Sequence, residues 1–341
     1  MLSVRNLWKV FGSGSVGRAI DLAGTGSTRA AVQQATGHTI GVCEVSFDVA
    51  GGETFVVMGL SGSGKSTLVR CLSRLIEPSR GSIHIDGEDL LAMSPDELRQ
   101  VRRTRMAMVF QHFGLFPHRR VIDNVAYGHE VQGVDKATRR RRAGEVLETV
   151  GLSAWASHYP QQLSGGMQQR VGLARALVLD PEIIFFDEPF SALDPLIRRG
   201  MQDELCALQT RQPRTVVFIT HDFAEAIRLG DRVAIMKDGV FDQVGTPTEI
   251  VSRPATDYVR EFTVDVDKAA VLTASAVMRS GVVDGATDGH TRRVLHDTKV
   301  DVLVGDLLRD PTPITVVDAD GVVLGVVGTA DVAGVLAPPR R

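Results

Sequence analysis

The sequence has no long run of apolar residues, because charges and glycines interrupt every candidate segment. A helix that crosses a bilayer needs roughly 18 apolar residues in succession. The opening segment MLSVRNLWKVFG also lacks the apolar region of a secretory signal. We therefore expect a chain that does not cross a membrane by itself and that resides in the cytosol.

Cysteine and net charge are scarce as well. The three cysteines, Cys43, Cys71 and Cys206, lie far apart and form no CxxC pair, which favours reduced thiols in the core. The 38 basic and 41 acidic residues leave a net charge of −3. A chain without a basic excess has no global field that attracts nucleic acid, so we expect no nucleic-acid partner.

The remaining composition is typical of a globular protein, with 43% hydrophobic and 23% charged residues. At roughly 150 residues per domain, a chain of 341 residues holds about two domains. Composition shifts near Val264, where a motif-dense sequence gives way to one rich in Val, Asp and Gly. We predict a larger domain over residues 1–263 and a small domain over residues 264–341.

The larger domain has the pattern of an α/β protein. The predicted strands cover 2–11, 42–49, FVVMG after Thr54, 183–186 and 215–220. The last two are continuous apolar runs, typical of strands buried on both faces of a parallel sheet. A Gly/Ser-rich insert separates the first two strands, and within it we expect a short helix with Ser27 as its N-cap and Gly37 as its stop.

In the small domain, the segments ITVV, DADG and VVLGVV predict a hairpin, and Asp331–Leu336 predicts a helix after it. We therefore expect a small α+β domain.

A glycine-rich segment, Gly59-Leu-Ser-Gly-Ser-Gly64-Lys65-Ser66, follows a strand and precedes a helix, which is the context of a phosphate-binding loop. Its glycines let successive backbone N–H groups point at phosphate oxygens. Lys65 suits the β- and γ-phosphates of a nucleotide, and the Ser66 hydroxyl suits Mg²⁺. The predicted nucleotide-binding residues are Gly59, Ser61, Gly62, Ser63, Gly64, Lys65, Ser66 and Thr67.

Two adjacent carboxylates, Asp187 and Glu188, end a buried strand, where ligands bind in open α/β sheets. Asp187 suits water-mediated binding of Mg²⁺. Glu188 suits the base that orients or deprotonates an attacking water. Their occurrence with a phosphate-binding loop favours a functional pair.

Further segments complete a recognisable set. Ser164, Gly165 and Gly166 stand at the start of the helix GMQQRVGLARAL, whose free N–H groups suit an anion. Gln111 lies in MVFQHFGLFPH, Asp194 in FSALDP and His221 in FITHD. Together these segments resemble the ATP-binding cassette (ABC) ATPases. The resemblance covers about residues 1–262, and the segments MGLSGSGKSTLVRCLSRLIEPSRGSIHIDG and LSGGMQQRVGLARAL are most similar to ATP-binding subunits of glycine betaine/proline (quaternary amine) importers.

This resemblance implies a P-loop ABC ATPase domain with a helical signature subdomain. It also implies a head-to-tail homodimer that binds ATP and Mg²⁺, with the loop of one copy and the Ser164–Gly166 signature of the other on either side of each ATP. Gln111 would sense Mg²⁺ and the attacking water, so it joins Ser66 and Asp187 as a metal-site residue. His221 would contact the γ-phosphate and assist Glu188 in catalysis, and Asp194 would couple the two sites.

The resemblance further implies two membrane permease subunits, an extracytoplasmic substrate-binding protein and a peripheral position on the cytoplasmic face of the cell membrane. An aromatic residue near the N-terminus would stack on adenine, and the spacing K-x-F-G favours Phe11, with Trp8 as the alternative. The apolar segment 112–119 after Gln111 suits contact with a partner helix.

Two rival functions remain open. One is an importer of another small polar solute, since cargo contacts lie on other polypeptides. The other is a soluble ABC ATPase without a transport role. Residues 314–337 resemble the last strand-strand-helix of a CBS (cystathionine-β-synthase) module in a single, degenerate copy, which implies a regulatory or structural tail. Gly328 stands where a nucleotide-binding module usually has Ser or Thr, whereas Asp331 is retained.

Overall fold

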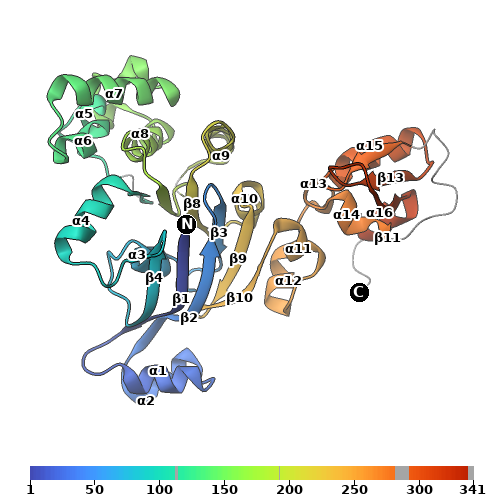
Figure 1. The fold of residues 1–341 in the computed structure, drawn as a ribbon, viewed down its shortest axis with the longest axis horizontal. Helices are drawn as coiled ribbons and strands as arrows, with labels where there is room; N and C mark the ends of the chain where they lie inside the picture. Colours follow the sequence, from blue (N-terminus) through green and yellow to red (C-terminus); the bar gives the residue numbers. More distant parts are fainter. Residues whose placement is uncertain (112–113, 192, 281–291, 337–341) are drawn as a thin grey trace. The chain divides into compact units, whose positions relative to one another are not determined.

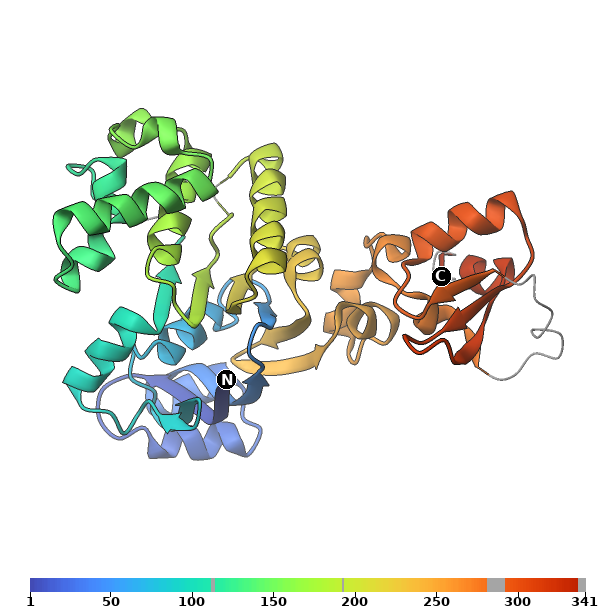
Figure 2. The same ribbon diagram turned by 45° about the horizontal axis from the view of Figure 1, so that its top comes forward.

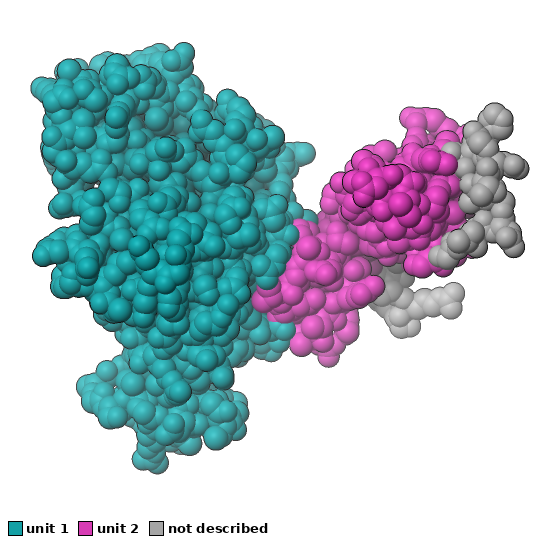
Figure 3. Space-filling model, viewed as in Figure 1, with its two compact units in different colours: residues 1–242 teal, residues 243–341 magenta. Residues whose placement is uncertain are grey.

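The computed structural model describes residues 1–111, 114–191, 193–280 and 292–336. The chain divides into two compact units, Met1–Asp242 and Gln243–Arg341 (Figure 3). This division falls earlier than the one after residue 263 that composition suggested. Helix α11 (Pro247–Ser252) packs against α12 (Asp257–Thr263) and α13 (Lys268–Val271), which explains why the second unit begins before the change in composition.

The described residues form a six-stranded sheet in the order β10-β9-β3-β8-β7-β6. β3 pairs in parallel with β8 and β9, and β7 pairs in parallel with β6 and β8. Every residue of β3, β7 and β8 is buried, as the apolar runs predicted. The strands are β3 (Thr54–Met58), β6 (Met106–Val109), β7 (Ile183–Asp187), β8 (Thr215–Thr220), β9 (Arg232–Lys237) and β10 (Val240–Gly245).

Helices cover this sheet, and Figures 1 and 2 show their arrangement. α3 packs on β7 and β8, α4 on β6, and α10 on β3 and β8, while α9 contacts α8 and α10. Phe55 and Phe185 lie in the large apolar core on one side of the sheet. The helices are α3 (Lys65–Leu72), α4 (Pro95–Thr104), α9 (Pro195–Arg211) and α10 (Phe223–Leu229).

In the part of the first unit that is described, a second, antiparallel sheet has the order β2-β1-β4-β5. Its strands are β1 (Leu2–Phe11), β2 (Thr39–Val49), β4 (Arg80–Ile85) and β5 (Glu88–Asp89). The first strand has the predicted bounds, and the second begins three residues before the predicted start at residue 42.

The insert between β1 and β2 contains two helices, α1 (Gly17–Gly24) and α2 (Arg29–Thr36). The predicted helix is α2, and Gly37 ends it in the left-handed conformation. The predicted N-cap was wrong by one residue, because the hydroxyl of Thr28 accepts the Ala31 N–H. α1 was not predicted, because the sequence has no capping signal before it: the N-cap residue is Val16, whose side chain cannot accept a hydrogen bond. Both helices close over a small core of Trp8, Val10, Ala19, Ile20, Val32 and Ile40.

A helical subdomain, coloured green in Figure 1, packs around its own core of buried side chains, among them Val121, Leu147 and Val171. This subdomain confirms the predicted architecture. None of the described helices is long and apolar enough to cross a bilayer. The α-helices here are α5 (Val121–Val125), α6 (Tyr127–Val131), α7 (Lys136–Thr149) and α8 (Gly165–Leu177), with short 3₁₀ turns at Ser153–Trp155 and Pro160–Gln162.

In the described part of the second unit, a small sheet has the order β11-β14-β13-β12. β13 and β14 form the predicted antiparallel hairpin and α16 follows it, whereas β12 is parallel to β13. The elements are α14 (Ala274–Val277), β11 (Arg279–Ser280), β12 (Arg293–Leu295), α15 (Val300–Arg309), β13 (Ile314–Val317), β14 (Val323–Val327) and α16 (Thr329–Leu336).

A buried asparagine orders the loop that leads into the helical subdomain. Asn124, on α5, is 0% exposed. Its Nδ2 donates to the carbonyl oxygens of Phe116, Arg119 and Arg120, and its Oδ1 accepts the Phe116 N–H at 2.8 Å. The Asn124 side chain thus supplies hydrogen-bond partners for backbone groups of residues 116–120, which precede α5.

We predict that Asn124→Ala lowers the free energy of unfolding by about 3 kcal/mol, because the partly buried Phe116 N–H and Arg119 carbonyl oxygen lose the hydrogen bonds that they make with Asn124. Urea denaturation measures this change. Gln33→Ala, at an exposed position of α2, is the control and changes stability by less than about 0.5 kcal/mol. Equal stability of the two variants would contradict a structural role for Asn124.

Candidate functional site

The glycine-rich loop joins the end of β3 to the start of α3, as predicted. Gly59 has φ +155° and Gly64 has φ +114°. A Cβ at Gly59 would lie 2.2 Å from the Met236 carbonyl oxygen, and one at Gly64 would lie 2.3 Å from the Gly41 carbonyl oxygen. Conformation and space therefore both require glycine at these positions. The Ser63 hydroxyl, also in the loop, is buried and has no hydrogen-bond partner among the described residues.

Lys65 is the first residue of α3 and is only 4% exposed. Its Nζ donates to the carbonyl oxygens of Gly59 at 2.8 Å and Leu60 at 3.1 Å, and it lies 3.4 Å from Glu188 Oε1. Burial lowers the pKa of Lys65, and the Glu188 carboxylate opposes this change. A buried ammonium beside curled backbone suits an anionic ligand such as a phosphate.

Ser66, in the first turn of α3, and Asp187, at the end of β7, lie in contact at the same edge of the sheet. A shared magnesium site requires this proximity. The Ser66 hydroxyl donates to Asp187 Oδ1 at 2.8 Å. Arg70, which the sequence analysis did not single out, donates to Asp187 Oδ2 at 3.2 Å. Asp187 is 3% exposed. A hydroxyl and a carboxylate are hard oxygen donors that fit Mg²⁺, which takes few protein ligands and fills its shell with water and phosphate oxygens.

Glu188 lies between Lys65 and His221. One carboxylate oxygen, Oε1, faces Lys65, and the other, Oε2, is 2.9 Å from His221 Nδ1. The Glu188 backbone has φ +46°, a left-handed conformation that is uncommon for residues other than glycine. Its side chain is 18% exposed and that of His221 is 52% exposed. The arrangement leaves a carboxylate that water can reach and that two basic side chains orient.

Gln111 reaches Glu188 through a serine. Its Nε2 donates to Ser191 Oγ at 3.1 Å, and Ser191 Oγ donates to the Glu188 carbonyl oxygen at 3.0 Å. The sequence analysis missed Ser191, because only the return of the chain after β7 brings it to Gln111. The two residues that follow Gln111, His112 and Phe113, lie outside the described residues.

The signature residues Ser164, Gly165 and Gly166 lie at the start of α8 and, among the described residues, do not contribute hydrogen bonds to the phosphate loop. Ser164 is the N-cap of α8 and its hydroxyl accepts the Met167 N–H. A Cβ at Gly166 would lie 2.5 Å from Ile197 Cγ2, so this turn packs closely on α9. Asp194 is the exposed N-cap of α9. In the described part of the chain, no hydrogen bond or ion pair joins Ser164, Gly165 or Gly166 to the phosphate loop.

The two aromatic candidates have different environments. Trp8 is 4% exposed and belongs to the core of the insert. Phe11 is 39% exposed, and Lys9 Nζ lies 5.0 Å from its ring centroid. Atoms of Phe11 and of Thr67 both lie within 3.0 Å of the position that a Cβ at Gly41 would take. Phe11 therefore lies next to the first turn of α3 and is partly exposed.

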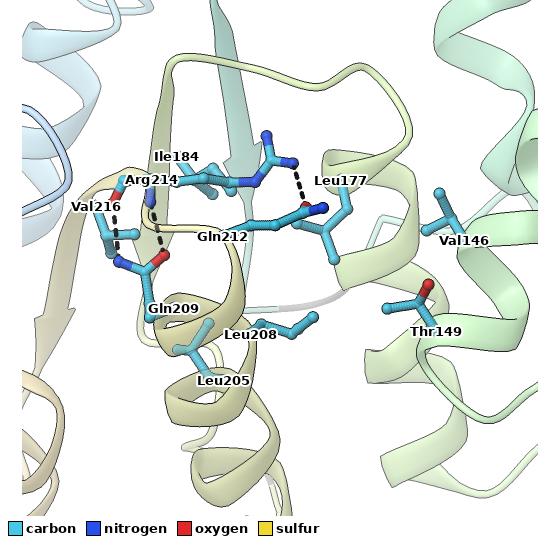
Figure 4. Close-up of a pocket in the computed structure, with 10 residues that line it drawn as sticks. All are labelled: Val146, Thr149, Leu177, Ile184, Leu205, Leu208, Gln209, Gln212, Arg214 and Val216. Atoms are coloured by element: carbon cyan, nitrogen blue, oxygen red, sulfur yellow. Dashed lines mark hydrogen bonds between the residues drawn. The ribbon is translucent and has the colours of Figure 1, made fainter.

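A small cavity of 80 Å³ lies elsewhere in the first unit, beside α9, with Ile184 and Val216 in its wall (Figure 4). Hydrogen bonds join three of its lining residues, Gln209, Gln212 and Arg214. Gln209 Nε2 donates to the Arg214 carbonyl oxygen, and Arg214 Nη2 donates to Gln212 Oε1. Ile184 and Val216 lie near the starts of β7 and β8, whereas the predicted site residues follow the ends of these strands, so the cavity is not part of the site.

Comparisons with known proteins agree with this geometry. Residues 42–191 match the family model described as ABC transporter. The chain is 54% identical to the glycine betaine transport ATP-binding protein OpuAA of Bacillus subtilis, over 82% of this chain and 66% of that protein. It is 52% identical to the trimethylamine N-oxide transport system ATP-binding protein TmoW of Ruegeria pomeroyi, over 89% and 91%.

It is also 52% identical to the glycine betaine/proline betaine transport system ATP-binding protein ProV of Escherichia coli, over 82% of this chain and 69% of that protein. Among solved structures, the chain is similar to the dimeric structure of the bacterial ABC transporter cassette MJ0796. The TM-score is 0.61 at 32% identity, and the match covers 72% of this chain and 98% of that one. A second structure of MJ0796, in a post-hydrolysis state bound to ADP and Pi, gives the same values.

We predict that Trp8→Ala impairs stability, whereas Phe11→Ala impairs ATP binding. Trp8→Ala lowers the free energy of unfolding by about 3–5 kcal/mol, because it empties the core of the insert. Phe11→Ala leaves folding intact but weakens ATP binding by about 1–3 kcal/mol through lost stacking. Thermal unfolding and calorimetric titration with ATP measure the two effects. A stable Trp8→Ala protein with lost ATP affinity would make Trp8 the stacking residue instead.

Proposed function

This chain belongs to the ATP-binding proteins of ABC transporters, and we propose that it energises the import of glycine betaine or a closely related methylated amine. The observation that carries the ATPase part of the proposal is the assembly of Lys65, Ser66, Asp187, Glu188 and His221 at one edge of the sheet. The choice of cargo rests on the similarity to OpuAA and TmoW. These groups supply phosphate binding, metal binding and a base for the hydrolysis of ATP. ATP hydrolysis coupled to transport is the activity of this family.

Lys65 and the loop amides would bind the β- and γ-phosphates of ATP. Ser66 and Asp187 would hold Mg²⁺, with Gln111 beside them, and the ion neutralises charge on the phosphates when bound. A phosphate near Lys65 competes with Glu188 for the ammonium. Glu188 Oε1 is then free to accept a proton from the attacking water. His221 would orient the other carboxylate oxygen, Oε2, and would contact the γ-phosphate.

A second copy of the chain would complete the site. Ser164, Gly165 and Gly166 offer N–H groups at the start of α8, away from the loop of their own chain, so they suit the γ-phosphate held by a partner. Asp194, exposed at the start of α9, would couple the two sites. The dimeric structure of the cassette MJ0796, which has this fold, supports a dimer for this chain.

The partners would be two permease subunits and an extracytoplasmic substrate-binding protein. This arrangement puts the chain on the cytoplasmic face of the cell membrane as a peripheral subunit. The half-buried Phe116, whose ring meets Tyr127 edge-on at 4.6 Å, lies in the segment expected to contact the permease.

Trimethylamine N-oxide is a second candidate cargo. The match to TmoW covers 91% of that protein, against 66% of OpuAA. Because cargo contacts lie on the other subunits, uptake of each compound by the complete transporter separates the two candidates.

We predict that Glu188→Gln lowers ATP hydrolysis by about 10²–10⁴-fold, the usual contribution of a positioned base. Glutamine keeps the shape of the side chain and so preserves ATP binding. An ATP-stabilised dimer should then accumulate, which light scattering detects.

Transport tests the whole proposal with the same variant. Proteoliposomes with the permease, the binding protein and the wild-type chain should take up glycine betaine or trimethylamine N-oxide when ATP is enclosed. Those with Glu188→Gln should not. Glu148→Gln, an exposed position on α7, is the matched control and should behave as wild type. Wild-type ATP hydrolysis by Glu188→Gln would contradict the assignment of Glu188 as the base. If the wild-type transporter takes up neither compound, the proposed cargo is wrong.

The second unit would act as a regulatory tail that resembles part of a CBS module. Within it, Asp331 is already engaged, because its carboxylate accepts the Gly328 N–H at 2.8 Å and the Arg279 Nε–H at 3.1 Å. A carboxylate bound in this way has less capacity for a nucleotide ribose. We therefore propose regulation through the charges of the tail itself.

We predict that removing residues 264–341 preserves ATP hydrolysis but flattens the dependence of transport on ionic strength. Ion pairs such as Arg279–Asp331 and Arg292–Asp310 weaken as the screening length falls below about 10 Å above 0.1 M salt. Uptake across a salt series, with and without the tail, measures the effect. Parallel curves would make the tail structural.

A further inference from the structure

An arginine from the insert contacts the back of the phosphate loop. Arg29 is the first residue of α2. Its Nη1 donates to the Gly62 carbonyl oxygen at 2.8 Å, and its Nη2 donates to those of Gly41 at 3.0 Å and Ser63 at 3.3 Å. Two of these acceptors belong to the loop itself, although the chain separates them from Arg29 by more than thirty residues.

The guanidinium sits in a confined space. A Cβ at Gly239 would lie 2.8 Å from Arg29 Nη2, and one at Gly64 would lie 3.4 Å from it. Nε is buried and has no partner among the described residues. The nearest acid is Asp238, whose carboxylate is 3.9 Å away and mostly exposed. The backbone carbonyl groups of the loop are thus the main polar partners of this cation.

Burial lowers the pKa of Arg29, but an arginine remains charged at neutral pH. The side chain therefore places a fixed positive charge directly behind the loop. The main-chain position is also fixed, because Thr28 caps α2 and Val32 is buried in the core of the insert.

The planarity of the peptide unit turns these contacts into an orientation. In a trans peptide, the N–H points opposite to the C=O. When Arg29 holds the carbonyl groups of Gly62 and Ser63, the N–H groups of Ser63 and Gly64 are directed away from the insert. The Ser63 N–H donates to the Leu60 carbonyl oxygen at 3.1 Å, which closes the turn of the loop. The Gly239 N–H also donates to the Ser63 carbonyl oxygen at 2.8 Å, which reinforces this orientation.

We propose that Arg29 is a positioning residue that holds the phosphate loop in its binding conformation and raises its affinity for the phosphates of ATP. The proposal rests on the nucleotide-binding function of the loop. The insert thereby has a role in the site: its core fixes α2, and α2 presents Arg29. Arg29 acts through the backbone of residues 62–64, not through direct contact with the reacting atoms.

Arg29→Ala tests the proposal in the full chain. The Kd for ATP with Mg²⁺, measured by calorimetry, should rise about tenfold, which corresponds to about 1.4 kcal/mol. KM should rise by a similar factor while kcat changes little, because Glu188 and its partners are intact. In nucleotide-free protein, hydrogen exchange of residues 59–66 should be faster. A merely stabilising contact elsewhere in the insert would not change exchange in this loop.

Two further variants complete the test. Arg18→Ala removes an exposed arginine from α1 of the same insert and should leave Kd and exchange unchanged. Arg29→Lys keeps the charge but loses the fork of donors, so its Kd should lie between those of wild type and Arg29→Ala. If Arg29→Ala does not fold, Arg29→Lys decides: an intermediate Kd with faster loop exchange supports the proposal, and wild-type values overturn it.

Lys65→Ala separates this proposal from the function of the loop. If Lys65→Ala loses ATP binding while Arg29→Ala binds as wild type with unchanged exchange, Arg29 has no positioning role and the loop still binds nucleotide. If Lys65→Ala binds ATP as tightly as wild type, the loop is not the nucleotide site, and the proposal for Arg29 falls with it.

Discussion

The contact between the buried Lys65 and the partly exposed Glu188 is the interaction around which the site is built. Removing the Lys65 ammonium from water costs on the order of several kcal/mol. The structure offsets this cost with the 3.4 Å approach of the two charges and with two backbone carbonyl groups that accept from Lys65. An anionic ligand can replace Glu188 as the partner of Lys65 without leaving that ammonium alone. In the proposed mechanism, phosphate binding and the release of Glu188 to act as the base are thereby linked through the charge of Lys65.

The parallel sheet explains how that contact is formed. Lys65 follows β3 and Glu188 follows β7, and β8 lies between these two strands. In parallel strands, the carboxyl ends lie at the same edge, so residues that are distant in sequence gather there. Gln111 after β6 and His221 after β8 reach Glu188 from either side, one through Ser191 and the other directly. Strand order therefore sets which side chains meet.

Two additions to the sheet have different relations to the site. The insert packs on β1 and β2 through its own core and reaches the phosphate loop through Arg29. The helical subdomain presents Ser164 at the start of α8. Among the described residues, no hydrogen bond joins this helix start to the phosphate loop of the same chain. The insert thus contacts the phosphate loop of its own chain. In the proposed dimer, the helical subdomain would supply the signature residues to the ATP site of the neighbouring copy.

The sequence alone determined the features that depend on neighbours along the chain. The spacing of Gly59, Gly64 and Lys65 predicts the loop, because the backbone conformations are set within a few residues. The apolar runs at 183–186 and 215–220 predict buried strands for the same reason. The tertiary structure alone decided which of Trp8 and Phe11 is buried, that Ser191 joins Gln111 to Glu188, and that Arg29 lies behind the loop. These contacts join residues far apart in the sequence, and their distances follow from strand order and helix packing, which no local pattern records.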